Sequence, residues 1–110
     1  MNYNILAIDN FKKEFKKLAK KYPSLKVDLI KLSEELELNP RLGAPIGKNC
    51  HKIRMAITSK GKGKSGGARV ITLVVFASEV LYLLSIYDKS DKENISEDEL
   101  IDFISQIPEE

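Results

Sequence analysis

Two long apolar segments with a short link between them restrict the possible folds of this 110-residue chain more than any other feature. Residues 70–76 are apolar on both faces of an extended backbone, and residues 80–87 are again almost entirely apolar. Short apolar runs bounded by turn signals are typical of buried strands. Residues 77–79 suit a tight turn, so we predict two adjacent antiparallel strands, the first of them central in its sheet.

A third strand is predicted just before this pair, over residues 50–58, and its two faces differ in character. Side chains alternate along a strand, so Lys52 and Arg54 point the same way. The opposite face carries His51, Ile53, Met55 and Ile57. Together the three strands form a predicted antiparallel meander, with a loop at residues 59–67 between the first and second strands.

The first 39 residues predict a short strand and two helices. Residues 3–8 favour the strand, and Asp9 suits the N-cap of the helix that follows. Apolar residues recur in that helix at helical spacing: Phe11, Phe15, Leu18 and Tyr22. Its other faces hold lysines: Lys12, Lys13, Lys16, Lys17, Lys20 and Lys21. Pro23 ends this helix, and leucines at spacings of four, three and four continue a second helix to Asn39, which completes an α-hairpin.

The chain after the meander predicts one more helix. Residues 96–99 read Ser-Glu-Asp-Glu, which is a capping box, and Ile95 and Leu100 are placed for a hydrophobic staple. Residues 40–49 contain two prolines and two glycines, so we predict a loop there. The predicted fold class is α+β, in a single domain over residues 1–110: an N-terminal strand, an α-hairpin, an antiparallel three-stranded meander and a C-terminal helix.

Composition excludes several classes of protein. No apolar run approaches the roughly 20 residues of a membrane span, and the first residues lack a secretory layout, so we expect a cytoplasmic protein with no membrane partner. Cys50 is the single cysteine, which excludes an internal disulfide and agrees with a reducing compartment. One cysteine and one histidine cannot alone supply a typical closed zinc site, and we expect neither a metal nor a cofactor.

Charge is distributed unevenly along the chain. Residues 39–78 have eight basic and no acidic side chains, residues 79–110 carry a net charge of −8, and residues 1–38 carry +2. A lysine-rich run is usually a solvated surface, which is the alternative for the loop at 59–67. Against this, Lys52, Arg54 and Arg69 lie on or beside predicted strands, which position side chains more rigidly than loops do. The acid-free segment therefore favours a polyanionic partner, most simply nucleic acid.

Two other interpretations of the basic segment are weaker. Residues 63–65, Gly-Lys-Ser, resemble the end of a phosphate-binding loop, but that pattern requires a glycine where Thr58 stands and a helix where a strand is predicted. His51 shares its predicted face with apolar side chains, so a packed or sheet-edge histidine is favoured over a general base. The segment contains no carboxylate, so it offers no ligands for a metal-dependent nuclease.

RNA can be cut without a metal ion, and suitable side chains are present. The 2′-hydroxyl attacks the neighbouring phosphate, so the protein must orient that hydroxyl, stabilise the added negative charge and protonate the leaving oxygen. Lysine, arginine and tyrosine can do this. Tyr87 and Lys89 lie at the end of the last predicted strand, although Tyr87 could equally be an aromatic that closes the core. For Cys50 a partly buried, unreactive thiol is favoured.

Short segments spread over nearly the whole chain carry a family resemblance: residues 15–22, Asn39-Pro40, Gly43, and residues 52–54, 62–71 and 83–89. In this order they resemble the RelE/ParE superfamily of toxins from type II toxin–antitoxin systems, in its RelE/HigB-like branch. The resemblance implies a RelE-like fold and a ribosome-dependent, metal-independent endoribonuclease that cleaves mRNA in the A site. It also implies a cognate antitoxin that neutralises the toxin.

The resemblance also implies roles for individual residues. Lys52 and Arg54 match the strand pair that contacts RNA and supplies acid/base chemistry or charge stabilisation. Arg69 matches the arginine that stabilises the pentacoordinate phosphate, and Lys89 falls near the basic residue after the last strand. The family's tyrosine in the C-terminal segment has no clear counterpart, since no tyrosine follows Tyr87, which becomes the candidate substitute. RNA binding without chemistry is expected from the loop lysines Lys60, Lys62 and Lys64.

Two rival functions stay open at this point. A ParE-like member of the superfamily would bind and inhibit DNA gyrase, and a degenerate member would bind nucleic acid without cutting it. The acidic C-terminal helix either folds back over the basic face or is displaced when the antitoxin binds.

Overall fold

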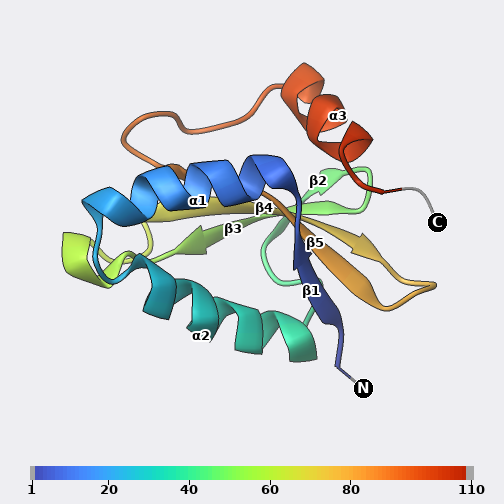
Figure 1. Ribbon diagram of the computed structural model, residues 1–110, viewed down its shortest axis with the longest axis horizontal. Helices are drawn as coiled ribbons and strands as arrows, with labels where there is room; N and C mark the ends of the chain where they lie inside the picture. Colours follow the sequence, from blue (N-terminus) through green and yellow to red (C-terminus); the bar gives the residue numbers. More distant parts are fainter. Residues whose placement is uncertain (1, 109–110) are drawn as a thin grey trace.

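The computed structural model describes residues 2–108, which form a five-stranded sheet with three α-helices and one short 3₁₀ helix (Figure 1). The strand order is β1-β5-β4-β3-β2. The strands are β1 (Asn4–Ala7), β2 (Ala44–Gly47), β3 (Cys50–Met55), β4 (Ala68–Val75) and β5 (Val80–Asp88). The helices are α1 (Asp9–Lys21), α2 (Leu25–Leu38), the 3₁₀ helix η1 (Thr58–Lys60) and α3 (Glu97–Ser105). None of the helices in this described range has the length and apolar character needed to cross a membrane.

The predicted meander is confirmed at the centre of the sheet, where β3 pairs antiparallel with β4 and β4 with β5. The α+β class and the predicted order of helices are confirmed as well. At the start of α3 the predicted capping box is formed: the Ser96 hydroxyl accepts from the Glu99 N–H, and the Glu99 carboxylate accepts from the Ser96 N–H. β1 runs parallel to β5, so the sheet is mixed rather than purely antiparallel.

Three local predictions are wrong. The loop predicted at 40–49 contains β2, which pairs with β3 at the edge of the sheet. Pro45 obscures this strand because proline lacks a backbone donor, yet an edge strand needs no donor on its outer side. Asp9 is the first residue of α1 rather than its N-cap, a position held by Ile8. The predicted strand at 50–58 ends at Met55, because the chain turns into η1.

α2 and α3 cover opposite faces of the sheet. α1 lies between these two helices, beside the edge of β5. Figure 1 shows α1 with α3 above it and α2 below it. Ile53 of β3 lines a groove with Leu32 of α2, whereas Ile71 of β4 lines a second groove with Leu100 of α3. This two-sided cover explains why all nine residues of β5 are buried and why the two central strands are apolar on both faces.

Side chains of α1 take over the edge of β5 where β1 ends. β1 pairs with only the first half of β5, so backbone groups further along need other partners. Asn10 donates to the carbonyl of Leu84 at 3.0 Å. Glu14 accepts from the Ser85 hydroxyl at 2.7 Å and from the Ile86 N–H at 3.4 Å. The sheet therefore depends on α1 as it would on another strand.

The Glu14→Ala variant tests this substitute pairing. Removing the carboxylate leaves the Ser85 hydroxyl and the Ile86 N–H without their acceptor, so we expect the free energy of unfolding to fall by about 1–3 kcal/mol. Urea denaturation followed by circular dichroism measures the loss. Glu34→Ala, on the exposed surface of α2, is the matched control and should change stability by less than about 0.5 kcal/mol. Equal effects of the two changes would contradict the role given to Glu14.

Candidate nucleic-acid interface

The candidate site is a row of side chains across three neighbouring strands. Arg54 of β3 lies opposite Arg69 of β4, and Arg69 lies opposite Tyr87 of β5. Lys52 lies one step further along the same face of β3, opposite Ile71. Directly opposed residues of antiparallel strands project to the same face, so the register brings these four predicted residues together. Three of them are cationic side chains, and no carboxylate belongs to the row.

The members of the row differ in exposure. Arg54 is exposed and Lys52 is partly buried, whereas Arg69 is only 4% exposed and Tyr87 only 6%. The groove between β3 and α2 has a volume of about 650 Å³, and its lining includes Lys52, Arg54 and Lys64 together with Asp28 and Glu35 of α2. The open positions of the site therefore lie over β3, and the buried ones lie over β4 and β5.

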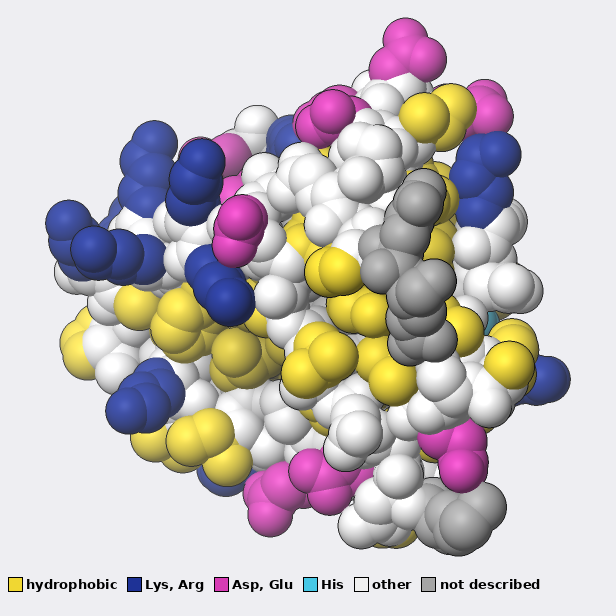
Figure 2. Space-filling view, turned by 45° about the vertical axis from the view of Figure 1, so that its right-hand side comes forward, with side chains coloured by type: hydrophobic (Ala, Val, Ile, Leu, Met, Phe, Trp, Pro, Cys, Tyr) yellow, Lys and Arg dark blue, Asp and Glu magenta, His cyan; other side chains and the backbone are white. Residues whose placement is uncertain are grey.

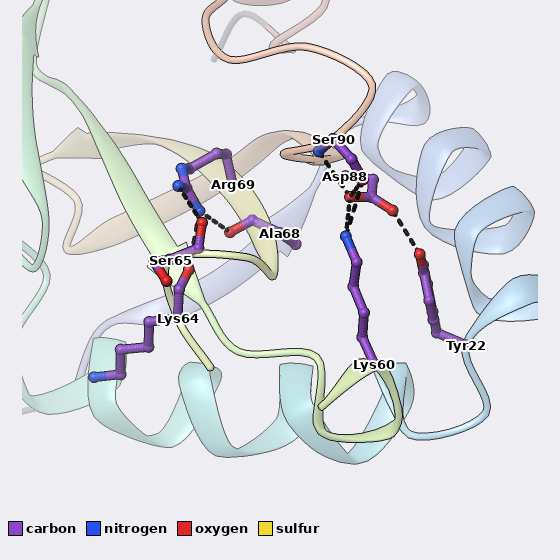
Figure 3. A network of polar contacts seen from close by, with 8 residues as sticks. All are labelled: Tyr22, Lys60, Lys64, Ser65, Ala68, Arg69, Asp88 and Ser90. Carbon is purple, nitrogen blue, oxygen red and sulfur yellow. Dashed lines mark hydrogen bonds and ion pairs between the residues drawn. The ribbon is translucent and has the colours of Figure 1, made fainter. Parts of the chain in front are cut away.

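Arg69 is held by the backbone of the basic loop. Its guanidinium donates to the carbonyls of Lys64, Ser65 and Ala68, at 3.1, 3.1 and 3.2 Å (Figure 3). These acceptors are neutral, and none of the carboxylates within residues 2–108 forms an ion pair with Arg69. In the same view the Lys64 side chain points away from Arg69, and both Lys62 and Lys64 are exposed. Arg69 thus fixes the end of the loop that presents these two lysines.

Lys60 is engaged at the other end of the loop, with the carboxylate of Asp88. Its ammonium lies 2.6 Å from Asp88 and 2.9 Å from the Ser90 hydroxyl, and its side chain is 12% exposed (Figure 3). Tyr22, at the end of α1, donates to the same carboxylate at 2.7 Å. The structure therefore places this predicted RNA-binding residue in an internal ion pair that joins η1, α1 and the end of β5.

The pKa of the Asp88 carboxyl reflects this enclosure. Burial by itself raises the pKa, but hydrogen bonds from Lys60, Ser90 and Tyr22 outweigh it and hold the pKa well below its ordinary range. The hydrogen bond between Tyr22 and Asp88 also raises the pKa of Tyr22, because the phenol donates its proton to a carboxylate. Asp88 is therefore ionised and Tyr22 neutral at physiological pH.

The segment that follows β5 lies against the row, and sequence reasoning did not find these contacts. The Lys52 ammonium donates to the side-chain carbonyl of Asn94 at 2.6 Å. The Tyr87 hydroxyl donates to the backbone carbonyl of Glu93 at 3.3 Å, and the Lys92 ammonium lies 5.0 Å from the centre of the Tyr87 ring. Lys92 is thus a further cation beside the row, and its ammonium is paired with the Glu99 carboxylate at 2.9 Å. No periodicity in residues 88–95 could have indicated where these side chains lie.

Burial raises the pKa of Tyr87, although the nearby charge of Arg69 opposes the change. Its phenol is therefore protonated at neutral pH and can act as a proton donor but not as a base. Lys89 stands two residues further along, where its backbone N–H donates to the Gly67 carbonyl at 3.0 Å. That bond ties the predicted basic residue after β5 to the end of the basic loop.

A comparison with models of protein families assigns this chain to a known family. The family model described as the RelE toxin of the RelE/RelB toxin–antitoxin system matches residues 10–107. The chain belongs to the RelE toxin family. The resemblance carried by the short sequence segments is thereby confirmed for almost the whole chain.

Solved structures of RelE toxins share the fold. A double mutant of the E. coli toxin RelE in the free state is 19% identical, with a TM-score of 0.65 over 98% of this chain and 100% of that chain. The toxin–antitoxin complex RelBE2 from Mycobacterium tuberculosis gives 14% identity and a TM-score of 0.62, covering 80% of this chain and 99% of the matched one. The intact E. coli RelBE toxin–antitoxin complex is 20% identical, with a TM-score of 0.60, and the match covers 78% of this chain and 95% of the matched one.

The remaining reactive side chains of this RelE family member are poor candidates for chemistry. Burial raises the pKa of the Cys50 thiol to about 11, so it is protonated at neutral pH. Burial also lowers the pKa of His51, with the charge of Arg41 adding to the effect. Within residues 2–108 no group of three or more histidine, cysteine or acidic side chains is placed to hold a metal ion.

The Lys60→Met variant tests the internal role of the Lys60–Asp88 pair. Removing one partner leaves a buried carboxylate without its countercharge, so we expect a loss of about 3–5 kcal/mol in the free energy of unfolding. Lys62→Met, at an exposed position two residues away, should change it by no more than about 0.5 kcal/mol. Urea denaturation of both proteins measures the difference. A loss of similar size in both would show that Lys60 is only a surface lysine.

Acid should weaken the fold partly through Asp88. Because its folded pKa lies below the ordinary value of about 3.9, its stabilising contribution is complete above roughly pH 4 and is lost as the pH falls through the folded pKa. In Asp88→Asn that contribution is absent, so the free energy of unfolding should depend less steeply on pH in this acidic range. Urea titrations at several pH values compare the two proteins, and identical slopes would refute the assignment.

Proposed function

We propose that this chain is a ribosome-dependent endoribonuclease that cleaves mRNA in the A site without a metal ion. The observation that carries the proposal is the row of Arg54, Arg69 and Tyr87 across three strands, with Lys52 beside it. Cleavage by the 2′-hydroxyl of RNA adds negative charge at the phosphate and needs a proton for the leaving oxygen. A row of cations next to a neutral phenol matches both requirements.

The exposed part of the row is the place where RNA would bind. Lys52 and Arg54 are the accessible cations of the row and border the groove beside β3, so they are assigned to the scissile phosphate and its neighbours. Planar guanidinium groups bind phosphate oxygens in pairs, which suits Arg54 to the developing charge. Lys62 and Lys64 extend from the adjoining loop and are assigned to binding of the RNA backbone rather than to chemistry.

The buried members of the row, Arg69 and Tyr87, are assigned supporting roles in the chemistry. Arg69 contributes positive charge from below, and its direct contact with phosphate requires residues 64–65 to release the guanidinium. Tyr87 carries a proton at neutral pH and is the candidate general acid, once Glu93 no longer accepts from it. Lys89, whose backbone N–H donates to the carbonyl of Gly67 near the start of β4, is assigned to the positive charge around the row.

The same proposal includes the partners of the protein. A ribosome in the cytoplasm would supply the mRNA and position its 2′-hydroxyl, because the row consists of three cations and a protonated phenol and contains no histidine or carboxylate to act as a base. A cognate antitoxin is proposed as the inhibitor, on the strength of membership in a family of toxins from RelE/RelB systems. Solved complexes of related toxins contain such antitoxins.

Cleavage is tested by adding the purified protein to a cell-free bacterial translation reaction and mapping mRNA 5′ ends by primer extension. We expect cuts within codons that appear only when ribosomes are present. Arg54→Ala should reduce the rate of cutting by about 100-fold or more, since it removes a donor aimed at the developing charge. Arg41→Ala, which removes another exposed arginine that stacks on Phe76, is the matched control and should cut like the parent.

The alternatives give different results in the same reaction. Translation that stops without new 5′ ends would indicate binding without cleavage. Full translation by the parent protein would leave inhibition of DNA gyrase as the next activity to assay. Arg54→Ala cutting at the parental rate would remove Arg54 from the site even if the parent is a nuclease.

A further inference from the structure

A second group of cations lies on α1, away from the row on the sheet. Six lysines occur as three adjacent pairs with a repeat of four residues, and all six are exposed: Lys12, Lys13, Lys16, Lys17, Lys20 and Lys21. At 3.6 residues per turn this spacing places them on one half of the helix surface. With a rise of about 1.5 Å per residue, the lysines extend over roughly 14 Å of the helix. We call this surface the lysine face of α1.

The protein does not neutralise the lysine face. The ion pairs within residues 2–108 are Lys60–Asp88 and Lys92–Glu99, so none of the six lysines touches a carboxylate there. Glu14, the one acidic residue inside α1 beyond its first turn, directs its carboxylate to Asn10, Ser85 and Ile86. Figure 2 shows several dark blue side chains gathered at the left of the molecule.

Repulsion within the lysine face opposes formation of the helix. Four lysine pairs stand four residues apart, and like charges at that spacing destabilise a helix. The two lysines of the last turn gain from the helix dipole, but those in the first half of α1 do not. A bound polyanion would relieve this repulsion along the whole helix. A solvated surface of mixed charge has no such repulsion to relieve.

The opposite half of α1 indicates which polyanion fits. Phe11 is buried and Phe15, Leu18 and Tyr22 pack against the core, so the helix has no free apolar side to insert into a membrane. Binding must therefore be electrostatic, to a surface with regularly spaced negative charge. The backbone of a folded nucleic acid has that property. The basic loop begins beside the C-terminal end of α1, because the Lys60 ammonium lies 5.8 Å from the centre of the Tyr22 ring.

We propose that the lysine face of α1 is a second nucleic-acid site, which binds the sugar-phosphate backbone of double-helical RNA outside the groove where a strand would be cut. The choice of RNA as the polyanion rests on the proposed function, whereas the site itself is inferred from the lysines of α1 alone. The site has no aromatic or amide side chain among its lysines, so it holds the backbone without reading the sequence of bases.

The test compares two triple variants in binding to an RNA hairpin with a continuous duplex stem. Lys12, Lys16 and Lys20, which form one row along α1, are changed to glutamine, which has a similar helix propensity. The control changes three exposed cations elsewhere, Lys26, Arg41 and Lys48, also to glutamine, so that both variants lose the same net charge. Fluorescence anisotropy at several salt concentrations gives the slope of log K against log salt for each protein.

We expect the slope of the α1 variant to be smaller in magnitude than that of the control by up to about 2.7, since each phosphate contact contributes roughly 0.9. A difference below about 1 would overturn the proposal. So would tighter binding of a DNA duplex of the same sequence, or equal competition by anionic phospholipid vesicles at matched phosphate. Because the hairpin assay needs no cleavage, failure of the ribosome reaction with a retained slope difference would count against the nuclease alone.

Discussion

The enclosed carboxylate of Asp88 holds together the part of the molecule on which the candidate site is built. Asp88 ends β5, and its oxygens accept from Tyr22 at the end of α1, from Lys60 in η1 and from Ser90 in the following segment. Three pieces of chain that are far apart in the sequence therefore meet on one side chain. A buried charge is costly without such partners, so the three donors and the carboxylate depend on one another.

This arrangement gives a loop rich in glycine and lysine a fixed position. η1 is fastened to α2 by the Asp28 carboxylate, which accepts from the hydroxyl and the N–H of Thr58. Gly61 and Gly63 then turn the chain with positive φ angles of 73° and 63°, which other residues rarely adopt. Beyond the turn Arg69 binds the loop carbonyls. The exposed lysines are thus presented by a loop that is held at both ends, which lowers the conformational cost of binding a ligand.

Local patterns in the sequence predicted the elements but not the contacts between them. Alternation along β3 placed Lys52 and Arg54 on one face, and the two apolar runs gave β4 and β5, because both signals arise from neighbouring residues. β2 was missed because Pro45 suggests a loop. The partners of Lys52 and Lys60, Asn94 and Asp88, are 42 and 28 residues away, and no periodicity records such a pairing.

The chemistry of these partners would decide which cations are available to RNA in the proposed nuclease. Lys60 faces a buried carboxylate, and a phosphate would have to displace that charge to bind it. Lys52 faces only the neutral amide of Asn94, and Arg69 only neutral backbone carbonyls. A bond between an ammonium or guanidinium group and phosphate is stronger than one to a neutral oxygen, so RNA can replace these partners. In the proposed nuclease, the cations of the row would thus be held by contacts weak enough to be exchanged for the RNA substrate.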